Sequence, residues 1–164
     1  MKRIGILLAD LFDEREFIYP YYRLLEAGHQ AVVVGPEARE YRAKSGLAWK
    51  AEVSAKEALP LDGLLIPGGF APDYLRRSPD VLALVRHLDG EGRPIGAICH
   101  AGWVLISAKV VKGRRVTGFF SIRDDLENAG GLDQEAGVVV DGRLATAQGP
   151  KDPPQFMGAF LSLL

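Results

Sequence analysis

The stretch "RPIGAICHAGW", residues 93–103, joins a short apolar run to a cysteine, a histidine and two small residues. The run Ile95–Ile98 is typical of a strand buried on both faces, as in a parallel sheet. The next segment, "AGWVLISA", predicts a helix, so Cys99 stands where a strand turns into a helix. It is the only cysteine in the chain, and His100 is one of three histidines. The junction therefore predicts an α/β fold with the single cysteine at one of its turns.

The same alternation of strand and helix continues along most of the chain. Strands are expected at 3–9, 29–35, 61–69 and 94–99, helices at 13–28, 78–90, 101–108, 121–131 and 152–164, and hairpins at 41–53 and 137–147. Pro20 lies inside the first helix and predicts a kink or a break there. Alternation of this kind favours a mostly parallel sheet with helices on both faces, and ligands bind such sheets at the carboxyl ends of the strands.

Length, composition and charge narrow the class of protein. A chain of 164 residues suits one domain over residues 1–164, with 48% apolar and 25% charged residues. The net charge of -1 gives no sign of a nucleic-acid or membrane partner. No apolar run approaches the roughly 20 residues of a membrane span, and the N-terminal run is too short for a signal peptide. A single cysteine makes no internal disulfide and no metal cluster, so we expect a cytoplasmic protein without a metal or other cofactor.

Cys99 has two interpretations. Ala97 and Ala101 flank it at the spacing of a nucleophile elbow, in which small residues make room for a sharp turn between strand and helix. A helix N-terminus would also lower the pKa of the thiol. The alternative is a small buried apolar residue, a common position for free cysteine. His100 is either its proton-transfer partner or a residue exposed in the first turn of the helix.

Two further places at the same sheet edge are ambiguous. Gly68 and Gly69 follow the strand 61–69, and they form either a plain turn or a pair of open N–H groups that bind an oxyanion. Asp13 and Glu16 have the spacing of a capping box, which is the simpler interpretation of Glu16. Because this helix starts at the same edge as Cys99, the Glu16 carboxyl could instead reach the thiol.

The chain resembles the PfpI intracellular protease family, within the superfamily of the Parkinson-disease-associated protein deglycase and the glutamine amidotransferases. The likeness covers nearly the whole sequence. Its motifs are "EFIYPYYRLLEAGH", "DGLLIPGGFAPDYLR", "GRPIGAICHAGWVLISA", "IRDDLENAG" and "VVVDGRLATAQGPKDPPQF". The resemblance implies a flavodoxin-like sandwich with a nucleophile elbow.

The resemblance also implies roles for individual residues. Cys99 would be the nucleophile, with His100 beside it and Glu16 against the thiol. In the protease-like branch an acid from a neighbouring subunit completes the site, and Asp73 matches its position, where the family usually has Glu. The family often has Tyr-Pro where this chain has Phe119-Phe120, so the tyrosine hydroxyl is absent here. The resemblance thus implies a homodimer or higher oligomer with Asp73 at the interface.

The predicted function is that of a cofactor-independent cysteine hydrolase acting in stress defence, as a protein deglycase, glyoxalase or peptidase. Its substrates would be small carbonyl compounds, glycated proteins or peptides, which the thiolate attacks at carbon. The backbone of Gly68, Gly69 or His100 would hold the oxyanion. The alternative is a redox-sensing stress protein without turnover, whose Cys99 oxidises to a sulfinate beside a carboxylic acid.

Overall fold

The computed structural model describes residues 1–164, built around a seven-stranded sheet. Its strands, in spatial order, are β10 (Val138–Asp141), β11 (Leu144–Ala147), β7 (Ile95–Ile98), β6 (Gly63–Ile66), β1 (Arg3–Leu7), β2 (Gln30–Gly35) and β5 (Val53–Ser54). Neighbouring strands are parallel except β10 and β11, which pair antiparallel as the predicted hairpin. Two small two-stranded sheets, β3 (Glu40–Arg42) with β4 (Ala48–Lys50) and β8 (Arg115–Val116) with β9 (Leu132–Asp133), lie outside it.

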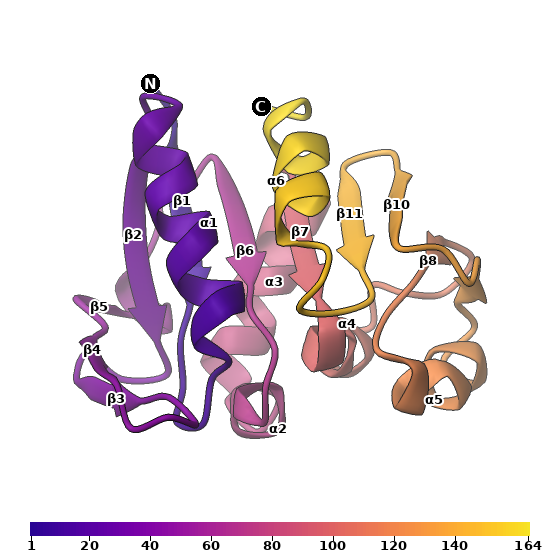
Figure 1. Ribbon diagram of the computed structural model, residues 1–164, viewed down its shortest axis with the longest axis horizontal. Helices are drawn as coiled ribbons and strands as arrows, with labels where there is room; N and C mark the ends of the chain where they lie inside the picture. The colour runs from indigo at the N-terminus through magenta and orange to yellow at the C-terminus, as the bar shows by residue number, and fades with distance from the viewer.

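Helices cover both faces of this sheet. They are α1 (Glu14–Glu26), α2 (Ala71–Leu75), α3 (Pro79–Gly90), α4 (Gly102–Ser107), α5 (Arg123–Asn128) and α6 (Pro153–Leu161). Figure 1 shows α1 and α6 side by side on the near face, with α3 behind the sheet. The flavodoxin-like sandwich is therefore confirmed. None of the helices is long and apolar enough to cross a lipid bilayer.

The central strands are apolar along their whole length because helices bury both of their faces. All four residues of β6 and of β7 are buried, and so are Ile4, Gly5, Ile6 and Leu7 in β1. A single cluster of 44 buried residues joins these strands to the helices on either side. Close packing of this kind holds the strand ends, and the loops that follow them, in fixed positions.

Pro20 does not break the first helix, so the predicted break is wrong, whereas the kink stays a prediction. α1 runs through it as one element from Glu14 to Glu26. Phe17 and Leu24, on either side of Pro20, are completely buried. Their packing against the sheet outweighs the hydrogen bond and the steric fit that proline loses inside a helix, a cost of about 3 kcal/mol.

Three loops meet at the carboxyl edge of the sheet, beyond the ends of β1, β6 and β7. The loop after β1 leads into α1, and an isolated bridge joins its Phe12 to Gly69 in the loop after β6. The predicted hairpin of β3 and β4 lies at the same end of the molecule (Figure 1). The backbone N–H of Lys44 in this hairpin bonds the carbonyl of Phe12 at 3.1 Å. This edge therefore gathers segments from four distant parts of the chain.

Candidate active site

Cys99 occupies a sharp turn directly after β7. Its φ is 62°, in the left-handed region that an L-residue rarely adopts, as the elbow interpretation predicts. Leu11, Lys109 and Glu135 also have positive φ, so this conformation is not unique to Cys99. A short 3₁₀ turn, Cys99–Ala101, follows, and the α-helix begins only at Gly102.

Glu16 points from α1 into the site and does not complete a capping box. The Asp13 side chain caps the helix by accepting from the N–H groups of Arg15 and Glu16. The N–H of Asp13, which a capping box would give to Glu16, bonds the carbonyl of Gly68 at 3.2 Å. The Glu16 Oε1 instead accepts the N–H of Gly68 at 3.0 Å, and Oε2 has no partner. Only 1% of Glu16 is exposed.

Gly68 separates the Glu16 carboxyl from Cys99 and leaves no room for a side chain. A Cβ on Gly68 would lie 2.5 Å from Glu16 Oε1 and 2.8 Å from Cys99 Cβ. Because its N–H is bonded to Glu16, Gly68 has none to offer an oxyanion, and that expectation needs correction. The backbone N–H groups of Gly69 and His100 instead favour the ionised form of the Cys99 thiol.

His100 lies against the thiol and is held in place by its own chain. Its Nδ1 is 3.2 Å from the Cys99 Sγ, and its Nε2 is 3.3 Å from the Ser121 Oγ. The ring stacks on Phe119, with centroids 4.8 Å apart, and meets the edge of Trp103 at 5.1 Å. Sequence reasoning missed these contacts, because residues about twenty positions away supply two of them.

The pKa of the thiol is raised, contrary to the prediction from a helix N-terminus. Burial, and then the charge of Glu16, raise the pKa of Cys99 to about 12, while the N–H groups of His100 and Gly69 act in the opposite direction. The six-residue helix α4 starts three positions later and does not reverse this. Burial and the nearby Asp13 raise the pKa of Glu16 to about 7. The thiol thus needs a base that removes its proton.

His100 has the protonation state that such a base requires. Burial, followed by the charge of Lys44, lowers the pKa of its imidazole, so the ring is neutral at neutral pH. If Nε2 carries the proton and donates it to Ser121, the lone pair of Nδ1 faces the thiol. The Cys99 thiol can then pass its proton to the His100 Nδ1, which lies 3.2 Å from the sulfur.

A cavity of about 250 Å³ opens onto the thiol. Besides Cys99, His100 and Gly69, it is lined by Asp13, Arg15, Lys44, Phe119 and Pro150. Sequence analysis assigned no site role to Arg15 or Lys44. Lys44 stands in the tip of a hairpin, and no local pattern indicates that this hairpin folds over the site. The cavity is large enough for a small carbonyl compound, and its only carboxylate belongs to Asp13.

Asp73 does not contact His100 of its own chain. It lies in α2 and forms an ion pair with Arg77, one turn further along. Phe70 is exposed and Tyr74 is partly buried, whereas Leu75 is completely buried. The contact of Asp73 with a partner subunit stays a prediction.

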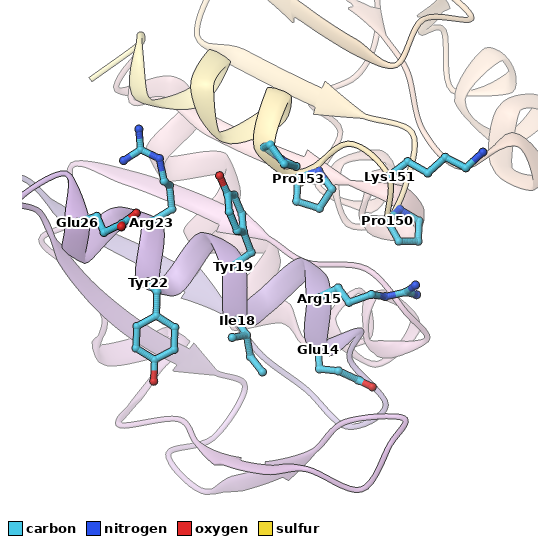
Figure 2. A pocket seen from close by; sticks show the side chains of 11 residues that line it. Glu14, Arg15, Ile18, Tyr19, Tyr22, Arg23, Glu26, Pro150, Lys151 and Pro153 are labelled. Atoms are coloured by element: carbon cyan, nitrogen blue, oxygen red, sulfur yellow. The ribbon is translucent and has the colours of Figure 1, made fainter.

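The largest cavity, about 710 Å³, lies away from the thiol, along α1 and beside Pro150–Pro154 (Figure 2). Tyr19, Tyr22 and charged residues of α1 line it, and no nucleophile does. It shares Arg15 and Pro150 with the cavity of Cys99. No three His, Cys, Asp or Glu side chains come together in a way that could hold a metal ion.

The fold and the turn at Cys99 define an α/β sandwich with a nucleophile elbow, and comparison with known proteins identifies the family. Residues 2–163 match the DJ-1/PfpI family, and the chain belongs to it. A relative from Pyrococcus furiosus, named deglycase PfpI, is 39% identical over 166 aligned residues that cover 99% of each chain. General stress protein 18 of Bacillus subtilis is 37% identical, covering 99% of this chain and 98% of the relative.

A solved structure shows the same fold in a larger protein. It is a two-domain protein from Anabaena variabilis with DJ-1/ThiJ/PfpI-like and ferritin-like domains, and it is 36% identical, with a TM-score of 0.97. The match covers 99% of this chain and 48% of that protein.

The raised pKa of Glu16 predicts how stability depends on pH. The folded state binds a proton that the unfolded chain releases near 4.5, so stability falls as pH rises from there to about 7. We expect the wild type to lose about 3 kcal/mol more than Glu16→Gln between about pH 5 and pH 8, measured by urea unfolding. The exposed Glu26, on the same helix, supplies the control Glu26→Gln. Parallel pH curves for the wild type and Glu16→Gln would contradict the assignment.

Proposed function

We propose that the protein is a cofactor-independent cysteine hydrolase that acts on small carbonyl compounds and their protein adducts, as a glyoxalase or deglycase. The observation that carries the proposal is the placement of Cys99. It stands on a turn with φ of 62°, with His100 Nδ1 at 3.2 Å, in a cavity of about 250 Å³. Relatives named as deglycases support this reaction class.

The first step is addition of the thiol to the carbonyl carbon. The S–H proton passes to Nδ1 of His100, the sulfur bonds to carbon, and the electron pair of the C=O moves to oxygen. The N–H groups of Gly69 and His100 stabilise that oxygen, which then takes the proton back from His100. Where the carbon carries a protein amine, the sulfur displaces the amine, which leaves with the proton.

The later steps need a group that exchanges protons near neutral pH. With a pKa of about 7, Glu16 can remove the hydrogen from the carbon bonded to sulfur and return a proton to the neighbouring carbon. The hydroxyl proton of the first carbon moves to the carbonyl oxygen of the second in the same isomerisation. For a 2-oxoaldehyde this gives a thioester, which water cleaves to a 2-hydroxy acid and the free thiol. The net reaction consumes one water, and the thiol and Glu16 end as they began.

The size of the cavity favours these substrates over peptides. A volume of about 250 Å³ is below the roughly 300–1,000 Å³ of typical ligand pockets, and much below what a peptide segment requires. The test compares the disappearance of methylglyoxal with the hydrolysis of a labelled unfolded protein, at equal enzyme concentration. Turnover of methylglyoxal supports the proposal, and hydrolysis of the protein alone would replace it with a peptidase.

A shared site predicts recovery of activity in mixed oligomers. Asp73→Ala and Cys99→Ser subunits should each be nearly inactive, because each lacks one part of every site. If Asp73 reaches His100 of a partner, a hybrid dimer holds one site with both defects and one intact site. Each hybrid dimer should then show about half of the turnover of a wild-type dimer, because one of its two sites is intact. Full activity of Asp73→Ala alone, or no recovery despite confirmed subunit exchange, would refute the shared site.

The redox-sensor alternative has one observation in its favour. Glu16 Oε2 is buried without a partner, and the raised pKa lets the carboxyl donate a proton to a cysteine oxyacid. Relatives include a protein named for general stress. Mass spectrometry after mild peroxide treatment distinguishes the roles, because a sensor should give a sulfinate that Glu16→Gln changes. An unchanged product distribution in Glu16→Gln, together with methylglyoxal turnover by the wild type, would exclude the sensor.

A further inference from the structure

Two cationic side chains, Arg15 and Lys44, line the cavity of Cys99 from distant segments. Both are tied to the buried carboxylate of Asp13. The Arg15 Nη2 lies 2.7 Å from the Asp13 Oδ2, and the Arg15 Nε lies 3.2 Å from the Asp13 Oδ1. The Lys44 Nζ lies 3.1 Å from the same Oδ2. The two cationic side chains are 62% and 48% exposed. Asp13 therefore fixes their position while leaving part of each in contact with the solvent of the cavity.

These two cations outnumber the carboxylates that line the cavity. Asp13 is the only lining carboxylate, so the wall carries one surplus positive charge while His100 is neutral. Although burial raises the pKa of Asp13, the Arg15 and Lys44 cations lower it overall, so the carboxylate is ionised. The charge of Lys44 also reaches the reacting groups, because it lowers the pKa of both His100 and Glu16. Figure 2 shows Arg15 at the start of α1, beside Pro150.

We propose that Arg15 and Lys44 form an anion-binding subsite at the mouth of the Cys99 cavity. The preferred substrate is then a carbonyl compound with a carboxylate close to its reacting carbon. The substrate class rests on the proposed function of Cys99, whereas the subsite itself does not. Both cations keep N–H donors free of Asp13, and a charge-assisted hydrogen bond from one of them would orient the substrate for attack.

Two alkylating reagents of nearly equal size test the subsite without turnover. Iodoacetate is anionic and iodoacetamide is neutral, and with each the Cys99 sulfur bonds to the CH₂ carbon while iodide leaves. Cys99 is the only cysteine, so mass spectrometry reports on this site alone. The ratio of the two rates cancels any change in the thiolate fraction, because both reagents react with the same thiolate. It isolates the attraction of the cavity for negative charge.

We expect Arg15→Gln and Lys44→Gln each to lower the ratio of iodoacetate to iodoacetamide rates by about threefold or more. Lys44→Arg should keep the wild-type ratio. The controls are Arg23→Gln, further along α1, and Lys50→Gln in the same hairpin as Lys44. An equal ratio in all variants, or an equal drop in the controls, overturns the subsite.

Salt and a second pair of probes complete the test. If Arg15→Gln or Lys44→Gln fails to fold, the wild-type ratio must still fall as sodium chloride rises to about 1 M, where charges are screened within about 3 Å.

Glyoxylate and glyoxal then report on the substrate class, since each forms a hemithioacetal in which sulfur bonds to carbon and oxygen takes the proton. Glyoxylate should protect Cys99 from iodoacetamide at about a threefold lower concentration than glyoxal, and lose that advantage in Lys44→Gln. Equal protection would refute the anionic substrate class even if methylglyoxal is turned over.

Discussion

Replacing Cys99 with serine should abolish methylglyoxal turnover, lowering kcat/KM by about 1,000-fold or more. The hydroxyl that replaces the thiol is a far weaker nucleophile and keeps its proton more tightly. The neutral His100 Nδ1, 3.2 Å from the sulfur, removes a proton less readily from the less acidic hydroxyl than from the thiol. The measurement is the initial rate of methylglyoxal loss at saturating and at low substrate concentration.

The same substitution should leave the fold intact. Cys99 is 7% exposed and bonds neither to a metal nor to another cysteine, so serine removes little packing. We expect the free energy of unfolding to change by about 1 kcal/mol or less. Cys99→Ala should lose as much activity as Cys99→Ser, which separates loss of the sulfur from an effect of the new hydroxyl. Either variant retaining a tenth of the activity would refute the nucleophile role.

Gly68→Ala should also cost most of the activity, although the residue touches no substrate. Its added methyl would lie 2.5 Å from Glu16 Oε1, 2.8 Å from Cys99 Cβ and 3.0 Å from the carbonyl oxygen of Ile98. The backbone oxygen and the Cβ cannot move aside as a flexible side chain would, so Glu16 and Cys99 must shift apart. A displacement of about 1 Å is enough for a hundredfold loss of kcat.

The stability of Gly68→Ala should fall by about 1–3 kcal/mol, as overpacking of a buried site predicts. Gly158→Ala is the matched control, because a Cβ on that helical glycine meets nothing within 4 Å. Alanine there should raise stability by about 0.5–1 kcal/mol and leave turnover unchanged. Wild-type turnover in Gly68→Ala would show that the carboxyl and the thiol need not keep this spacing.

The raised pKa of Cys99 shows where local reasoning about the site fails. A cysteine that precedes a predicted helix suggests a stabilised thiolate. In the folded chain, burial and the charge of Glu16 dominate, and the helix starts too late to oppose them. Both effects come from segments distant in the sequence, so no pattern around residue 99 contains them.

The role of Gly68 was misjudged for a similar reason. The Gly68-Gly69 pair correctly marks a loop at the edge of the sheet where the backbone approaches the site. Which backbone N–H stays unpaired depends on the side chain that α1 places beside the loop. The Glu16 carboxyl accepts the N–H of Gly68. The same kind of long-range contact brings Lys44 to the cavity and supplies Ser121 and Phe119 to His100.

The sequence by itself determined the alternation of buried strands and helices, and with it the sandwich and the turn at Cys99. These features follow from short-range signals: four apolar residues fill a strand buried on both faces, and small residues flank the turn. Tertiary structure alone decided the protonation of Cys99 and Glu16, the partner of each N–H, and the cations of the cavity. Burial, electrostatic fields and hydrogen bonds depend on distances in space, and only the packed fold brings residues 16, 44, 68, 99 and 121 to one edge of the sheet.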